Sequence, residues 1–304
     1  GLSARHGLAL VMGTFLPAIV LSGMGQINYL VDRMLAMPLG EGCVSSLHYA
    51  WKMVLLPGTL VSVAFATPLL SHLSHHEAAK DRREASRLMR DTARLLINMS
   101  IPLTMLMIVL SPSAVSLFNG WGKFSERGVF LTSVALFCYA PGLPFVIILP
   151  ILVAGFMAVR KPWIPVLVSL PMIPLNWLLD RLLMGFLFHA GIAFSTSLVY
   201  GLNCFVLVVI LNRHLPLWDQ EKQGTPAGGR SLFFYMCVAI LFAAVSAVHV
   251  KTGTRVHLRI EILLEIAIVS TMTLTGFLLL AYAFDMPFVK SLDHFLKRPA
   301  GKGD

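Results

Sequence analysis

Residues 166–187 read VLVSLPMIPLNWLLDRLLMGFL, an apolar stretch that holds one amide and one carboxylate four residues apart. Residues four apart on a helix share a face, so the amide oxygen of Asn176 and the carboxylate of Asp180 are predicted to converge on one point. A carboxylate in hydrocarbon is costly, and an ionisable side chain inside a membrane span is by default a candidate functional site. The stretch therefore predicts a membrane-spanning helix that carries a polar site.

The composition extends this reading to the whole chain. Hydrophobic residues make up 57% of the 304 positions and charged residues 13%, whereas a soluble domain carries about 25% charged residues. A membrane-spanning helix needs about 20 mostly apolar residues. Eight segments meet this requirement: 8–37, 44–71, 95–118, 128–158, 163–187, 191–212, 231–250 and 260–284. Because they are continuously apolar and lack the alternation of barrel strands, the predicted fold is all-α, a polytopic membrane bundle of eight transmembrane helices.

The net charge of +9 could suggest a nucleic-acid partner, but its distribution argues against one. Sixteen of the 24 Lys and Arg residues lie near the N-terminus, within 80–94, 160–161 and 213–230, or in the last fifteen positions. In the eight-helix topology these segments all fall on one side, which the positive-inside rule marks as cytoplasmic. Both termini are therefore predicted to be cytoplasmic, with the basic loop 250–259 as an exception on the outer side.

Turn-forming residues suggest where the chain divides. Residues 214–230 are rich in Pro and Gly and read as a cytoplasmic linker. We therefore predict a six-helix lobe over 1–213, a transmembrane helix pair over 231–285 and a cytoplasmic tail over 286–304. The polar stretch 72–94 is predicted to form an amphipathic helix at the cytoplasmic surface.

Proline is concentrated in the fourth and fifth segments. A proline inside a helix removes a backbone hydrogen bond and tends to kink it. Transporters place broken helices around a site near the membrane midplane, although membrane helices also tolerate proline without such a role. Pro171 and Pro174 shortly precede Asn176 and favour the first interpretation.

Short motifs along the first six segments occur in a specific order and spacing. They include Gln26–Asn28, Leu30–Asp32, Val44–Ser45, Tyr49–Ala50, Gly142–Pro144, Gly191–Ala193 and Thr196–Leu198. Over residues 8–213 the chain resembles the C-terminal half of the MurJ (MviN) family of lipid II flippases, which belongs with the multidrug and polysaccharide exporters. The resemblance implies a fourteen-helix fold of two six-helix lobes and a helix pair. This chain would supply the seventh to fourteenth helices, as a fragment or a half-transporter, with the N-terminal lobe in the same or another chain.

The resemblance also implies an ion site. Asp32, Asn176, Asp180 and Thr196 match the family's sodium-binding positions, and Ile192 would contribute its backbone carbonyl. Carboxylate, amide, hydroxyl and carbonyl oxygens are the ligands that a hard cation prefers. Sodium is therefore the predicted cofactor.

Two alternatives stay open for the acidic residues. Asp32 could pair with Arg33, and Asp180 with Arg181, but neighbours in sequence point about 100° apart on a helix, which makes these pairs poor. A buried aspartate with a raised pKa could also carry a proton in place of sodium.

Lys52 falls where the resemblance implies a cavity arginine that binds substrate. A lysine can bind phosphate as a point charge but cannot offer the bidentate fork of arginine. The alternative is a lysine that snorkels to the membrane interface. Leu55 and Ala154 depart from the family pattern, which often has an acidic residue and an arginine there.

These observations favour a lipid II flippase, or its C-terminal half, that works by ion-coupled alternating access in the bacterial inner membrane during peptidoglycan synthesis. Its partners would be a lipid-linked diphosphate sugar and the membrane lipids, with no nucleic acid. An exporter of another lipid-linked glycan or drug is one alternative, and a membrane scaffold without transport is another. An enzyme is not expected, because the sequence lacks a nucleophile–base pair, a metal cluster and a phosphate loop.

Overall fold

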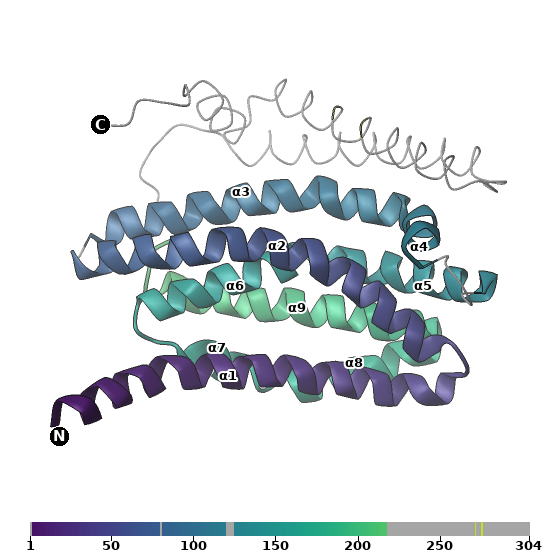
Figure 1. Cartoon of the computed structure of the whole chain (residues 1–304), viewed down its shortest axis with the longest axis horizontal. Coiled ribbons are helices and arrows are strands. Elements are labelled where there is room, and N and C mark those ends of the chain that lie inside the picture. Colours follow the sequence, from purple (N-terminus) through teal and green to yellow (C-terminus); the bar gives the residue numbers. More distant parts are fainter. Residues whose placement is uncertain (1, 80, 120–124, 218–270, 272–274, 276–304) are drawn as a thin grey trace. The chain divides into compact units, whose positions relative to one another are not determined.

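The computed structural model describes residues 2–79, 81–119 and 125–217, together with Thr271 and Thr275, and the described residues form helices joined by short turns (Figure 1). The elements are α1 (Leu2–Ala36), η1 (Met37–Leu39), α2 (Cys43–Ala78), α3 (Arg82–Val109), α4 (Ser111–Asn119), α5 (Glu126–Tyr139), η2 (Ala140–Gly142), α6 (Leu143–Ala158), α7 (Trp163–Ser169), α8 (Met172–Leu187) and α9 (His189–Asn212). No strand occurs among these residues, and the predicted all-α class is confirmed.

The chain divides into two compact units. The first is built from residues 1–100 and 122–219, and the second from residues 101–121 and 220–304. Every site residue predicted from the sequence lies in the first unit. Most of the predicted linker and all of the predicted helix pair and tail lie outside the described residues, apart from Thr271 and Thr275, so those assignments stay predictions.

Five helical spans in the described part of the chain are long and apolar enough to cross a membrane. They are 43–77, 82–109, 126–158, 163–187 and 189–212. The predicted first segment corresponds to α1, which is 35 residues long. The total of eight spans stays a prediction, because the last two segments are not described.

The predicted amphipathic helix over 72–94 is wrong. Residues 72–78 are the last turns of α2, and residues 82–94 are the first turns of α3. Asp81 caps α3, because its carboxylate accepts a hydrogen bond of 3.2 Å from the Glu84 backbone N–H. Arg, Glu, Ala, Leu and Met all favour helix, so the polar residues extend two long helices and form no separate one.

The predicted helix breaks occur where the prolines are. The span 163–187 is interrupted between α7 and α8, where Pro171 stands immediately before α8 and has no N–H to continue the ladder. The span 126–158 is interrupted by η2, which contains Pro141. In Figure 1, α7 and α8 lie along α1, so the break at 170–171 faces the helix that carries Asp32.

Small residues allow the helices to approach closely. A Cβ atom on Gly191 would lie 2.4 Å from the backbone carbonyl of Leu183, and one on Gly142 would lie 2.8 Å from the Ser197 Oγ. Apolar side chains in lipid gain little from the hydrophobic effect, so membrane helices associate through such close contacts and through polar bonds. Gly191 brings the start of α9 against α8, and Gly142 brings η2 against Ser197 of α9, the helix that carries part of the site.

Candidate functional site

An amide joins two buried carboxylates at the centre of the first unit. The Nδ2 atom of Asn176 donates to Asp32 Oδ1 at 2.7 Å and to Asp180 Oδ2 at 3.0 Å. The three side chains are 5%, 1% and 0% exposed in the order Asp32, Asn176 and Asp180. The structure therefore brings together one residue of α1 and two of α8.

The direction of the amide differs from the expectation. The sequence analysis placed the amide oxygen of Asn176 beside the carboxylate of Asp180, but the amide nitrogen faces both carboxylates. Two acceptors flank the side chain, and a single NH₂ group has one hydrogen for each of them. In this arrangement Asn176 therefore links the two acids through its amide nitrogen.

Helix α9 supplies the remaining donors. Ser195 Oγ donates to Asp180 Oδ1, and Thr196 Oγ1 donates to Asp32 Oδ2 at 3.1 Å. Both hydroxyls also lie within hydrogen-bond distance of the Ile192 carbonyl, at 2.8 Å and 2.9 Å. Each of the four carboxylate oxygens thus faces one donor, and the carbonyl predicted from the resemblance lies beside the hydroxyls.

Ser195 is a site residue that the sequence analysis missed. The run Ser195, Thr196 and Ser197 could have identified it. Three consecutive hydroxyl residues in a helix point in directions about 100° apart and can therefore reach different neighbouring helices. Ser195 reaches Asp180 on α8, Thr196 reaches Asp32 on α1, and Ser197 donates to the Cys138 carbonyl on α5 at 2.9 Å. One turn of α9 therefore bonds to three other helices.

The alternative ion pairs with sequence neighbours do not form. Arg33 lies 4.4 Å from the centre of the Tyr29 ring, and its Nη2 atom is 2.8 Å from His48 Nδ1. Arg181 lies over the Trp177 ring at 5.5 Å. The three ion pairs among the described residues all lie within 77–91, so neither acid has a cationic partner there.

Electrostatics limits what this site can be. Two ionised carboxylates this close would repel each other, and the cost of burying charge is high where water is excluded. A proton on one acid or a bound cation relieves that repulsion. The available oxygens, from carboxylates, hydroxyls and a carbonyl, suit a hard cation such as sodium.

Lys52 is not part of this cluster. It is exposed on α2, one helical turn after His48, whose Nδ1 atom contacts both Tyr29 Oη and Arg33 Nη2. Lys52, His48 and Arg33 form a separate basic group on α1 and α2. Ala154 is 4% exposed, so the arginine common in the family would not fit without repacking.

A bundle of apolar helices with broken spans and a buried pair of carboxylates defines a multi-pass membrane protein of the transporter class. The comparisons with known proteins specify that class further. The family described as Lipid II flippase MurJ matches residues 3–283, and the chain belongs to this family.

Curated relatives carry the same name. The chain is 29% identical over 211 residues to the lipid II flippase MurJ of Burkholderia cenocepacia, covering 69% of this chain and 41% of the relative. It is also 29% identical over 191 residues to the probable lipid II flippase MurJ of Rickettsia prowazekii, covering 63% and 38%. The chain thus spans about two fifths of the length of these relatives.

Solved structures support the fold. A lipid II flippase MurJ in an inward closed conformation matches with a TM-score of 0.68 at 21% identity, over 94% of this chain and 55% of that one. A multidrug resistance MATE family transporter of the MOP superfamily, in an outward-facing conformation, matches with a TM-score of 0.61 at 14% identity, over 90% and 64%.

Proposed function

We propose that this chain is the C-terminal half of a lipid II flippase that works by ion-coupled alternating access. Membership of the MurJ family and the names of its relatives support lipid II as the substrate. The remaining helices would come from an N-terminal lobe in the same or another chain. The protein would act in the bacterial inner membrane, with both termini cytoplasmic, and would serve peptidoglycan synthesis.

The buried acid pair is the observation that carries this proposal. Asp32 and Asp180 lie on different helices, and their repulsion changes when one charge is neutralised. Protonation state or ion occupancy would therefore alter how strongly α1 and α8 are held together. That is the differential interaction that a two-state transporter needs in order to respond to an ion.

The oxygens of Asp32, Asn176, Asp180 and Thr196 and the Ile192 carbonyl would hold sodium. When bound, the ion supplies one positive charge against two carboxylates. Asn176 would have to present its amide oxygen in place of its nitrogen, which requires a rotation of about 180° about the last side-chain bond. Ser195 would keep its bond to Asp180 and fix the orientation of that carboxylate.

Lys52 would contact the substrate diphosphate. It is exposed on α2, one turn after His48, and the Arg33 guanidinium that lies 2.8 Å from the His48 ring adds positive potential nearby. Lys52→Ala should abolish growth of a flippase-depleted strain when the change is made in a protein that contains both lobes, whereas Lys52→Arg should support growth. Full growth with both variants would leave Lys52 as a snorkelling residue.

Thermal unfolding in detergent tests the ion site directly. Sodium at 100 times its dissociation constant adds about 2.7 kcal/mol of stability, which is roughly 5–10 °C at 2–4 °C per kcal/mol. Potassium should add less, because it is larger. Asp180→Asn should stay folded and lose the sodium response.

A matched control distinguishes loss of the ion site from the general effect of removing a buried amide. Asn176→Ala should weaken the sodium response, whereas Asn203→Ala should keep it, because Asn203 is a buried amide of α9 that donates to Ser169 and does not contact either acid. A sodium response in Asp180→Asn equal to that of the parent would remove the ion site. A sodium response with no transport by the two-lobe protein would favour the scaffold.

A further inference from the structure

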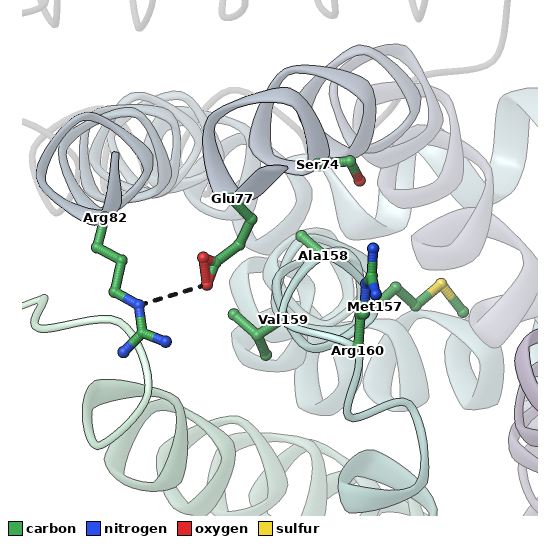
Figure 2. A pocket seen from close by; sticks show the side chains of 7 residues that line it. All are labelled: Ser74, Glu77, Arg82, Met157, Ala158, Val159 and Arg160. Carbon is green, nitrogen blue, oxygen red and sulfur yellow. Dashed lines mark ion pairs between the residues drawn. The ribbon is translucent and has the colours of Figure 1, made fainter. Parts of the chain in front are cut away.

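A cavity of about 690 Å³ lies where the end of α2, the start of α3 and the end of α6 meet. It is separate from the acid pair. Figure 2 shows the side chains that line it: Ser74, Glu77, Arg82, Met157, Ala158, Val159 and Arg160. Both arginines of this lining come from helix ends, so the cavity lies at one end of the spans and not in their middle.

The lining carries more positive than negative charge. Glu77 is its one acid, and the closest contact between Glu77 and Arg82 is 3.7 Å, long for a charge-assisted hydrogen bond. The side chain of Arg82 stays 68% exposed. Arg160 has no ion-pair partner in the described part of the chain.

The backbone fixes where Arg160 stands. Its φ of 57° ends α6 in the left-handed conformation, and its N–H donates to the Met157 carbonyl at 3.0 Å. The N–H of Lys161 donates to the Phe156 carbonyl at 2.9 Å, which completes a helix-terminating motif. Figure 2 shows the Arg160 side chain beside Ala158 and Met157, which line the same cavity.

The surroundings add to the positive potential. His214 follows α9, and burial lowers the pKa of its imidazole below the usual 6.5. The charges of Lys161, Arg82 and Arg213 lower this pKa further, so these three cations act on the same region. The positive field therefore extends from the cavity to the end of α9.

We propose that this cavity binds the phosphodiester headgroup of an anionic phospholipid. Figure 2 shows Arg82 and Arg160 on opposite sides of the end of α6, where each guanidinium group offers paired N–H donors that match phosphate oxygens, and the Ser74 hydroxyl can donate as well. Met157, Ala158 and Val159 form an apolar wall beside these donors, which suits the start of an acyl chain better than a free ion. Basic pockets between membrane helices recognise lipid headgroups in this way.

The test uses the full chain in a neutral detergent and measures ligand affinity by the shift in melting temperature. The probes are short-chain phosphatidylglycerol, short-chain phosphatidylcholine and inorganic phosphate. Phosphatidylglycerol should stabilise the protein and phosphatidylcholine should not. If inorganic phosphate and phosphatidylglycerol at the same concentration raise the melting temperature equally, the lipid proposal is refuted and the cavity is a site for free anions.

Substitutions of the two arginines and of the glutamate should change lipid affinity in opposite directions. Arg160→Gln and Arg82→Gln should each weaken the binding of phosphatidylglycerol about tenfold, because each removes a charge-assisted donor. Glu77→Gln should strengthen this binding, because the competing carboxylate is gone. Arg87→Gln is the matched control, since Arg87 lies on α3 outside the cavity and pairs with Glu84 and Asp91. If Arg87→Gln weakens lipid binding equally, or if Glu77→Gln does not strengthen it, the lipid is attracted by the surface charge in general, and the proposal is refuted.

Discussion

Two glycines on either side of the turn between α8 and α9 should respond to alanine with opposite signs. A Cβ on Gly191 would lie 2.4 Å from the backbone C and O atoms of Leu183 and 2.7 Å from the N atom of Met184. Backbone cannot move aside as a side chain can, so the two helices must separate, at a cost of about 1–3 kcal/mol. A Cβ on Gly185 meets nothing within 4 Å.

Gly185→Ala should therefore raise stability, by up to about 1 kcal/mol, because alanine is the better helix former. At about 2–4 °C per kcal/mol, the two variants should lie on opposite sides of the parent when their melting temperatures are compared in one detergent. Gly191→Ala melting at or above the parent temperature would mean that α8 and α9 are not packed as closely as described.

Three other perturbations follow from single observations. Phe188 has φ 58° and ψ −140°, a strained conformation that costs about 1–3 kcal/mol; Phe188→Gly should raise the melting temperature, and Phe188→Ala should not. Ser195→Ala should destabilise by about 1.5–3 kcal/mol, and by much less when Asp180→Asn is already present, as a double-mutant cycle of melting temperatures would reveal. The pKa of His214 is lowered in the folded state, so the unfolded chain binds the proton first and stability should fall as pH drops below about 6.5; His214→Asn should flatten this slope, and an unchanged slope would assign it to other groups.

The site was partly predictable because helix periodicity is a local property. Asn176 and Asp180 had to share a face, and they do. Asp32 came from a resemblance, since no local rule links residues 144 positions apart in sequence. The amide direction and the role of Ser195 depend on which acceptors surround them in the folded protein. That information is tertiary and is absent from any single segment.

The fold was predictable where hydropathy and proline agree. Pro171 marked the break between α7 and α8, and Pro141 marked η2. The start of α3 was missed, because a hydropathy threshold begins a span at its first apolar run, near residue 95. The helix begins at Arg82, where charged side chains can reach water while the backbone is already helical.

The consecutive hydroxyls of α9 have a mechanical consequence. Ser195, Thr196 and Ser197 bond to three different helices along directions about 100° apart. Turning α9 about its own axis would break all three bonds together, whereas withdrawing α1 alone from α9 breaks only the bond of Thr196. Within this unit α9 is therefore held to α8, α1 and α5 by three separate hydrogen bonds. Withdrawal of one neighbouring helix would therefore leave the other two bonds of this turn of α9 in place.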